Sequence, residues 1–375
     1  MTKISILRIK PDLMNTLEML GASGIRKCFD CGVCTVTCPF SEEYGGEPFP
    51  RKVIKYVKLG VEDKLVASLE PWLCYHCGDC SDSCPKGADP SEILAAARRY
   101  LIIKYDFTGR VSRFLHLTKY GWLIGVLVVA TITLLIGLIF RGPIITDRTM
   151  LETFAPVVVV DTAGLIVFAL LALFLLLNIY RMYRFTVGSL KGIPLSMALR
   201  ELVEIPKHFF TQVKLSKCSF RKYHFIHLMI FYGYALSFLL FVVLLRFTLT
   251  NEPFLFKHPL SILGIISIIL LLIGLFYIIK GRFEKKYHVW KYSHTSDWIY
   301  TWLLALTVAS GVLTGIFRTL DYPLLTYVMF ALHIIFAACF LVLMVPFGKW
   351  SHLAYRPFAI YFARLKMLKE RGFVR

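Results

Sequence analysis

Six long apolar runs constrain this chain more than any other feature of its sequence. Each run has about 20 residues or more, enough for a helix to cross a hydrocarbon core roughly 30 Å thick. Of the 375 residues, 57% are hydrophobic and the mean hydropathy is +0.64, which is typical of a membrane protein with several spans. The runs lie near residues 119–140, 155–180, 224–247, 260–280, 296–318 and 324–347.

The distribution of basic residues predicts how these spans are oriented. The net charge is +19, yet residues 1–118 contain 16 Lys and Arg against 14 Asp and Glu, so the excess lies in the apolar part. The segment 181–222 has nine basic and two acidic residues, and the loop after the fourth run and the tail at 349–375 are also basic. By the positive-inside rule, these segments and both termini lie on the cytoplasmic side of the cytoplasmic membrane. This charge distribution argues against a nucleic-acid partner.

Eight of the ten cysteines form two copies of one motif, which we call the first and the second comb. The pattern C-x2-C-x2-C-x3-C-P occurs at 28–39 and again 46 residues later at 74–85. This spacing is used for [4Fe–4S] clusters. Three thiolates from one tight loop can wrap a cubane, whereas the fourth begins a helix that leads toward the other cluster. The first cluster is therefore predicted on Cys28, Cys31, Cys34 and Cys84, and the second on Cys74, Cys77, Cys80 and Cys38.

Zinc is the alternative for these cysteines. Structural zinc sites pair two C-x2-C units, and three successive steps of this kind would crowd one tetrahedral ion. The N-terminus has no apolar signal segment, so we expect the combs to lie in the reducing cytoplasm, where dense cysteines favour metal sites over disulfides. His76, inside the second comb, is expected to hydrogen-bond beside a cluster. Asp89, Pro90 and Glu92 predict a helix start with a capping box.

Histidines near the apolar runs are candidate haem ligands. His224 and His227 begin the third run and His352 follows the sixth, so all three are predicted at the cytoplasmic depth. A b-type haem needs two imidazoles from neighbouring helices. His227 and His352 are the predicted pair, while His224 could replace His227 or bind a propionate or a quinone oxygen.

A second haem is left open by the sequence. His333 precedes His352 by 19 residues, about 28 Å along a helix, and His258 is the only other histidine predicted on the outer side. One haem b is therefore predicted and two are allowed. No histidine follows a C-x-x-C pair, so covalent c-type haem is not expected.

Asp161 is an acidic residue inside the second apolar run. A carboxylate there either pairs with a cation, for which Arg246 is the candidate, or accepts protons in quinone chemistry. His224, His227 and Asp161 are the candidate proton-transfer residues for a quinone.

The order of these motifs resembles a known combination. Residues 1–108 resemble the C subunits of heterodisulfide reductases, which are helical two-cluster ferredoxins. Residues 119–355 resemble the cytochrome b subunits of heterodisulfide and nitrate reductases, and the segment Pro346–His352 is similar to the haem-ligand helix end of the nitrate reductase gamma subunit. The fusion resembles the C subunits of the quinone-interacting membrane-bound oxidoreductases (Qmo) of sulfate reducers.

This resemblance implies an electron-transfer subunit that uses menaquinone and works with soluble flavin and iron–sulfur subunits. It also implies a link to adenylylsulfate reductase. The nitrate reductase pattern has a second histidine ten residues after the first, but Tyr234 stands at that place here. The chain contains no doubled cysteine and no GxGxxG, so we do not expect it to reduce a disulfide by itself or to bind a flavin or NAD.

These features together predict an all-α fold. It consists of a ferredoxin domain at 1–108, a linker at 109–118, a six-helix transmembrane bundle of cytochrome b type at 119–350, and a basic interfacial tail at 351–375. The predicted function is electron transfer between menaquinone, haem b, two [4Fe–4S] clusters and soluble partner subunits in sulfate respiration. The alternatives are a quinol-oxidising subunit of a heterodisulfide-reductase-like complex and a membrane anchor with structural metal centres.

Overall fold

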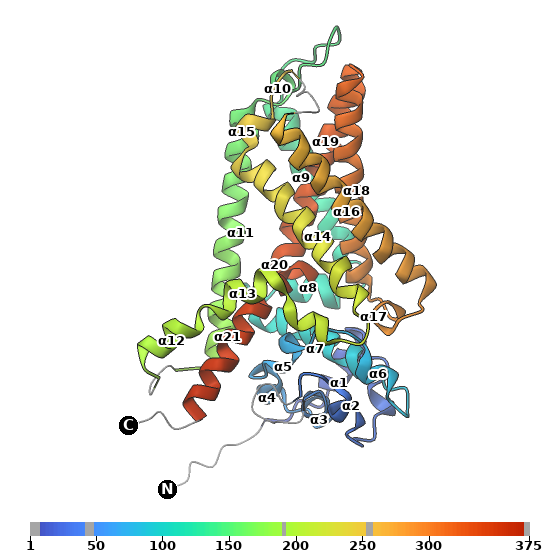
Figure 1. The fold of residues 1–375 in the computed structure, drawn as a ribbon, viewed down its shortest axis with the longest axis vertical. Coiled ribbons are helices and arrows are strands. Elements are labelled where there is room, and N and C mark those ends of the chain that lie inside the picture. Colours follow the sequence, from blue (N-terminus) through green and yellow to red (C-terminus); the bar gives the residue numbers. More distant parts are fainter. Residues whose placement is uncertain (1–7, 42–48, 190–192, 253–257, 371–375) are drawn as a thin grey trace.

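The computed structural model of the chain describes residues 8–41, 49–189, 193–252 and 258–370. These residues form helices and connecting segments, with no β-strand among them. Figure 1 shows small helices gathered at one end of the molecule and long helices that run from there to the opposite end. The predicted all-α fold, with a cluster domain followed by long apolar helices, is confirmed.

The small-helix end is built from the N-terminal residues, and its longest helix lies at its centre. Its elements are α1 (Leu13–Met19), η1 (Ile25–Lys27), α2 (Val33–Thr37), α3 (Arg51–Lys58), α4 (Glu62–Val66), α5 (Glu70–Leu73), α6 (Asp79–Asp82) and α7 (Pro90–Tyr105). Nearly all side chains of α7 are buried, because the other helices surround it. Pro90 begins α7 as expected, since its missing N–H costs nothing at that position.

The capping box predicted at the start of α7 is wrong. Asp89 has a left-handed backbone (φ 49°) and its side chain caps no N–H of the helix. Glu92 turns away from the helix start and binds His76 instead, with 2.8 Å between its carboxylate oxygen and the imidazole Nε2. The contact with His76, from another part of the chain, has therefore replaced the predicted local contact at the helix start.

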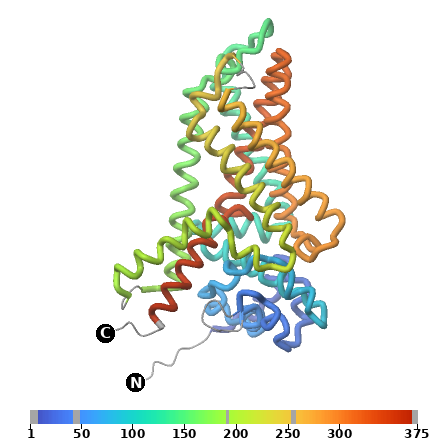
Figure 2. The backbone as a smooth tube through the Cα atoms, viewed as in Figure 1, coloured from blue at the N-terminus to red at the C-terminus, as the bar shows by residue number. Residues whose placement is uncertain are grey.

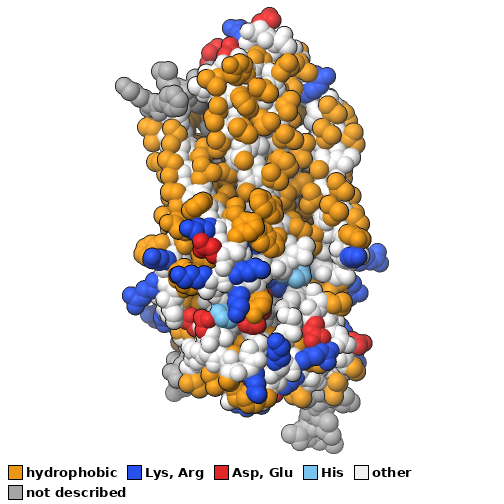
Figure 3. Space-filling model, turned by 90° about the vertical axis from the view of Figure 1, so that its right-hand side faces the viewer, with side chains coloured by type: hydrophobic (Ala, Val, Ile, Leu, Met, Phe, Trp, Pro, Cys, Tyr) orange, Lys and Arg blue, Asp and Glu red, His pale blue; other side chains and the backbone are white. Residues whose placement is uncertain are grey.

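Six helices are long and apolar enough to cross a membrane, and they match the six predicted runs to within a few residues at most ends. They are α9 (Gly121–Phe140), α11 (Val157–Thr186), α14 (Lys222–Phe238) with η3 (Leu239–Val243), α16 (Pro259–Glu284), α18 (Thr295–Thr319), and α19 (Pro323–Cys339) with η4 (Phe340–Met344) and α20 (Val345–Phe347). Figure 3 shows a broad hydrophobic surface over these helices, with charged side chains concentrated toward the small-helix end. Such a surface suits a lipid environment.

Short elements connect the long helices. They are α8 (Val111–Leu117), α10 (Leu151–Phe154), α12 (Leu195–Glu201), α13 (Glu204–Thr211), η2 (Val213–Lys217), α15 (Leu245–Thr248), α17 (His288–Lys291) and η5 (Lys349–Ser351). The predicted linker at 109–118 thus contains a helix, α8, whose His116 binds the backbone oxygen of Phe347 at 2.8 Å. Figure 2 shows the chain returning to the small-helix end, where both ends of the described chain lie.

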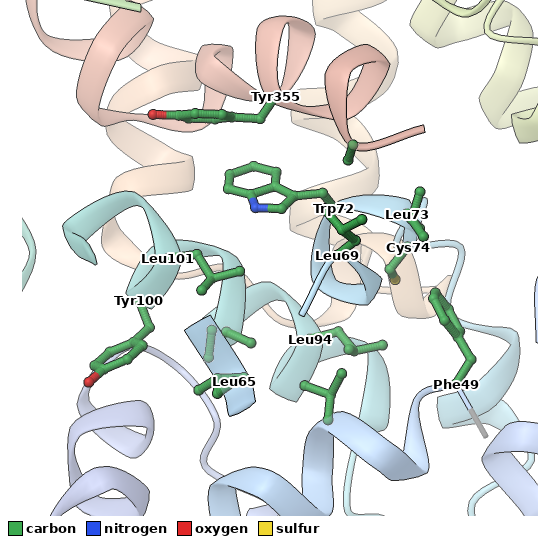
Figure 4. Close-up of a cluster of buried hydrophobic side chains, with 14 of the residues drawn as sticks. Phe49, Leu65, Leu69, Trp72, Leu73, Cys74, Leu94, Tyr100, Leu101 and Tyr355 are labelled. Atoms are coloured by element: carbon green, nitrogen blue, oxygen red, sulfur yellow. The ribbon is translucent and has the colours of Figure 1, made fainter. Parts of the chain in front are cut away.

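The last helix, α21 (His352–Glu370), belongs to the core of the small-helix end. Tyr355 is fully buried against Trp72 of α5, with ring centroids 4.6 Å apart and ring planes inclined at 38°, and Figure 4 shows Tyr355 of α21 above Trp72. The tail predicted to lie at a membrane interface therefore also joins the ferredoxin region to the bundle. Burying two large aromatic side chains stabilises this junction by several kcal/mol, at about 2 kcal/mol or more each.

Candidate functional site

The two combs repeat in structure as well as in sequence. Asp30 and His76, 46 residues apart, both have left-handed backbones (φ 61° and 57°). Gly32 and Gly78 follow with φ of 91° and 94°, a conformation that favours glycine. A short helix then carries the third cysteine of each comb, α2 in the first and α6 in the second.

The fourth cysteine of each comb lies beside the other comb. Cys84 is close enough to interact electrostatically with Cys28 and Cys34. Cys38 interacts in the same way with Cys74 and Cys77, and Cys80 interacts with all three. The structure therefore brings together the same two groups of four thiols that the spacing predicts as ligand sets.

The second group of thiols lines one small pocket. Cys38, Cys74, Cys77 and Cys80 all face this pocket, which Phe40 and Phe49 also line. Within the described residues, no three cysteine, histidine or carboxylate side chains converge on a point where one metal ion could sit. Four thiols that line one pocket are the donor set of a [4Fe–4S] cluster.

Burial disfavours the charged thiolate form of these cysteines when no cation lies near them. Burial, with a smaller contribution from neighbouring thiols, raises the pKa of Cys34 to about 11 and that of Cys38 to about 12. Iron would supply the compensating positive charge. Backbone N–H groups of His76 and Ala88 donate to the sulfurs of Cys74 and Cys84, each at 3.3 Å, and such bonds are among the features that set cluster potentials.

The rings of His227 and His352 are neighbours at the boundary between the bundle and the small-helix end, with their planes inclined at 74°. Their ring centroids are 5.8 Å apart. A metal–nitrogen bond is about 2 Å, so two imidazoles on one metal have centroids about 6 Å apart. The spacing of the predicted pair is therefore compatible with two imidazoles on one iron.

Hydrogen bonding at this pair also suits metal ligation. His352 donates its Nδ1–H to the backbone oxygen of Lys349, which leaves Nε2 free, as is usual for ligating histidines. The Nδ1 of His227 is buried and has no hydrogen-bond partner among the described residues. Burial lowers the pKa of His352 well below its usual value, so the neutral, ligating form prevails.

The remaining predicted histidines are not brought to this pair. His224 donates from Nε2 to the backbone oxygen of Thr211 at 3.2 Å. His333 donates from Nδ1 to the backbone oxygen of Thr307 at 2.9 Å, which leaves its Nε2 free. His258 accepts the N–H of Leu260 at 3.3 Å as the cap of α16. In the described part of the chain, the rings of His258 and His333 do not contact each other.

Asp161 lies at the opposite end of the bundle from the His227–His352 pair. It is buried near the start of α11, and its Oδ2 forms an ion pair with Nε of Arg246 at 2.6 Å. Figure 1 places this part of α11 beside α15, far from the small helices. The predicted ion pair between Asp161 and Arg246 is thus formed, and Asp161 lies far from His224 and His227.

Arg356 connects the histidine pair to the second comb, and sequence reasoning missed it. It lies one helical turn after His352 in α21, on the same face. Its guanidinium donates from Nε to the backbone oxygen of Trp72 and from Nη2 to that of Cys74, both at 3.1 Å. Arg98 of α7 donates to the same Cys74 oxygen at 3.2 Å. Only the placement of α21 reveals this contact.

A buried charge network joins the same two regions. Asp297, at the start of α18, accepts from Arg99 of α7 at 2.7 Å and from Lys349 at 3.0 Å. Burial lowers the pKa of Lys349 to about 8, although Asp297 opposes this shift. A buried carboxylate shared by the buried Arg99 and the partly exposed Lys349 fixes the position of α7 against the bundle.

Comparison with known proteins assigns the comb region. Residues 24–88 match the family described as "4Fe-4S dicluster domain". A protein of Archaeoglobus profundus, described as like the C subunit of heterodisulfide reductase, is 35% identical over 89 residues. These residues cover 24% of this chain and 47% of that protein.

Two further relatives match the same fraction of the chain. The iron–sulfur C subunit of the CoB–CoM heterodisulfide reductase of Methanopyrus kandleri is 29% identical over 89 residues, 45% of its length. The C subunit of the H2:CoB-CoM heterodisulfide,ferredoxin reductase of Methanothermobacter thermautotrophicus is 25% identical over 91 residues, 48% of its length.

The N-terminal region is a 4Fe-4S dicluster domain like that of the heterodisulfide reductase C subunits. The chain spans about half the length of the curated relatives it matches, and the matches cover about a quarter of the chain. No solved structure matches the chain. The dicluster domain thus has relatives in reductase complexes, and it is followed here by six membrane-type helices.

Proposed function

We propose that this chain is the membrane electron-transfer subunit of a quinone-linked oxidoreductase complex. It would pass electrons between menaquinone, haem b, two [4Fe–4S] clusters and soluble flavin or iron–sulfur subunits. The observation that carries this proposal is the 5.8 Å His227–His352 pair, because the helix of His352 also carries Arg356, which donates to the backbone oxygen of Cys74. A membrane redox site and a cluster site would then adjoin each other in one folded unit.

The proposed ligand sets follow the two groups of thiols. Cys28, Cys31, Cys34 and Cys84 would hold the first cluster, and Cys74, Cys77, Cys80 and Cys38 the second. His227 and His352 would hold haem b, and when bound these groups each accept or release one electron at a time. His333 keeps a free Nε2 and is the proposed ligand for any second haem, with no second imidazole beside it among the described residues.

Protons must accompany electrons at a quinone. His224, at the end of α14 near the His227–His352 pair, is the proposed group that binds a quinone oxygen or relays its proton. Asp161 is less suited to this role, because its carboxylate is already paired with Arg246, with 2.6 Å between Oδ2 and Nε. A paired carboxylate is a weaker proton acceptor. The quinone pocket is thus proposed at the cytoplasmic end of the bundle.

The fusion of a dicluster domain of this type with six apolar helices supports membership of the Qmo C-subunit family. That membership implies adenylylsulfate reductase as the eventual partner in sulfate respiration. The second candidate is a quinol-oxidising subunit of a heterodisulfide-reductase-like complex. It is favoured by the names of the relatives, which are C subunits of heterodisulfide reductases or proteins like them.

An anaerobic reduction experiment tests the proposed function. The complex is purified from its own cells in mild detergent, and a menaquinol analogue is added while optical spectra are recorded. We expect reduction of a b-type haem followed by reduction of iron–sulfur signals, and loss of both responses in His352→Ala. A complex that contains clusters but no b-type absorption, or whose haem ignores the quinol, contradicts the proposal and favours a membrane anchor.

A further inference from the structure

The membrane part of the chain covers one face of the second comb. Tyr75 is 5% exposed, and the guanidinium of Arg356 lies over its ring at 4.5 Å. Gly78 lies against His288 of α17 so closely that an added Cβ would approach the His288 Cβ to 2.6 Å. This face of the comb is therefore in direct contact with α21 and α17.

Two acidic residues of α6 extend the same contact. Asp79 accepts the backbone N–H of Ser219, in the segment that enters α14, at 3.2 Å. Asp82, whose side chain is otherwise 62% exposed, lies with its carboxylate oxygen 2.9 Å from Nε2 of His288. These contacts are all made to segments that flank the membrane helices, so this is the side by which the second cluster would exchange electrons with the bundle.

Among the described residues, nothing covers the corresponding face of the first comb. Phe29 corresponds to Tyr75 and is 56% exposed; Val36 corresponds to Asp82 and is 88% exposed. Val33, which takes the place of Asp79, is also exposed, as is the predicted ligand Cys31. Figure 1 places α2, which carries Val33 and Val36, at the end of the molecule remote from the long helices.

We propose that this uncovered face, defined by Phe29, Cys31, Val33 and Val36 and called the port face here, is the docking surface for a soluble redox protein. The inference rests on the proposed function. In that function the second cluster exchanges electrons with the bundle, and the first cluster would exchange electrons with the soluble protein. The internal repeat makes the two faces equivalent in backbone, while their side chains differ. One face is covered within the chain, and the other is apolar and open.

The charges around the port face indicate the chemistry of the partner. Lys27 and Lys86 are exposed, and the ammonium of Lys86 lies over the Phe29 ring at 5.5 Å. Arg51 lines the hollow beside Cys31. Lys58 pairs with Asp30 at 2.7 Å, which neutralises that acid. Among the described residues the rim is thus basic, and a partner with an apolar centre and an acidic rim would be complementary.

Other occupants fit this face less well. A second copy of the chain would bring one basic rim against another, which costs free energy. A lipid surface is disfavoured by position, because the port face lies away from the hydrophobic band around the long helices. A soluble partner whose own redox group lies near its surface would place that group close to the exposed Cys31.

Photo-crosslinking in the intact complex identifies the occupant. p-Benzoylphenylalanine is introduced at position 36 in the organism's own cells, and at Ile9 as a control that is also well exposed. We expect position 36, and not position 9, to cross-link to a protein that carries a flavin or iron–sulfur group. Cross-links to lipid, to a second copy or equally from both positions would overturn the proposal.

A binding measurement separates the port face from the proposed function. Soluble subunits that co-purify with the tagged chain are removed with salt and added back to wild type, Val36→Asp, Ile9→Glu and Lys86→Glu. We expect Val36→Asp to weaken rebinding at least about tenfold, Lys86→Glu to weaken it only at low salt, and Ile9→Glu to have no effect. Both cluster signals are recorded by EPR as a control for folding.

The outcomes distinguish two failures. If Val36→Asp rebinds the soluble subunits as strongly as wild type and keeps both cluster signals, the proposal that the port face is a docking surface is overturned. The proposed function is then unaffected. A wild-type complex without cluster or haem signals contradicts the proposed function itself.

Discussion

The cysteine combs and the His227–His352 pair are assembled in opposite ways. The combs draw eight ligand candidates from two local repeats, whose turns and helix starts have the same backbone angles. The histidine pair joins residues 125 positions apart, from α14 and the start of α21. A local motif carries its geometry with it, whereas the histidine pair exists only because the helices dock correctly. The following predictions test how far this difference extends.

Replacing the fourth cysteine of either comb should have the largest effect of these changes, because it removes a whole cluster. Cys38→Ser should abolish the same EPR signal as Cys77→Ser, and Cys84→Ser the same signal as Cys31→Ser, because each fourth thiol lies with the other comb. Iron content should fall by about half in each variant, since one of two clusters is lost. If Cys38→Ser instead resembles Cys31→Ser, each comb binds its own cluster.

Removal of either histidine of the pair should abolish one b-type haem. His352→Ala and His227→Ala should lose the same absorption band and keep both cluster signals, because the dicluster domain supplies its own ligands. His224→Ala is the matched control and should keep the haem, since His224 bonds to Thr211 and not to the pair. Haem retained at wild-type level in His352→Ala contradicts the ligand assignment.

Much of this architecture can be read from the sequence, for a physical reason. A span must satisfy its backbone within one helix, so the six runs predict six helices closely. The combs are equally readable because ligand spacing is local. Arg356, Asp297 and the burial of Tyr355 could not be predicted, since they depend on how α21 and α18 pack against α5 and α7. Glu92 shows the same limit, because a distant His76 outcompetes its local cap.

Loss of the shared carboxylate should loosen the junction between the two regions. Asp297→Asn leaves the buried Arg99 without its anion and removes the partner of the partly exposed Lys349. Breaking a buried ion pair costs about 3–5 kcal/mol. We expect a lower thermal unfolding midpoint of the purified complex and release of haem before the clusters. Glu284→Gln removes an exposed ion pair with Lys280 and should change stability by less than about 1 kcal/mol. Equal midpoints for both variants would show that the network does not hold the regions together.

The smallest effect is expected at Arg356. Its positive charge lies beside Cys74 and one turn from His352, so it should stabilise the reduced forms of both the second cluster and the haem. Arg356→Gln should lower the ratio of reduced to oxidised second cluster up to about tenfold at fixed potential, equivalent to roughly 59 mV for one electron. The haem should shift in the same direction, the first cluster should not, and Arg356→Lys should restore part of the effect. A shift confined to the first cluster contradicts the proximity of the second cluster to the bundle.

The central claim is that the dicluster domain and the membrane histidines form one electron path. A redox-poised titration of the purified complex, followed by EPR and optical spectroscopy together, tests it most directly. The account predicts two [4Fe–4S] signals and at least one b-type haem per chain, with magnetic or electrostatic interaction between the haem and only one cluster. Two clusters without haem, or a haem that interacts with neither cluster, would contradict it.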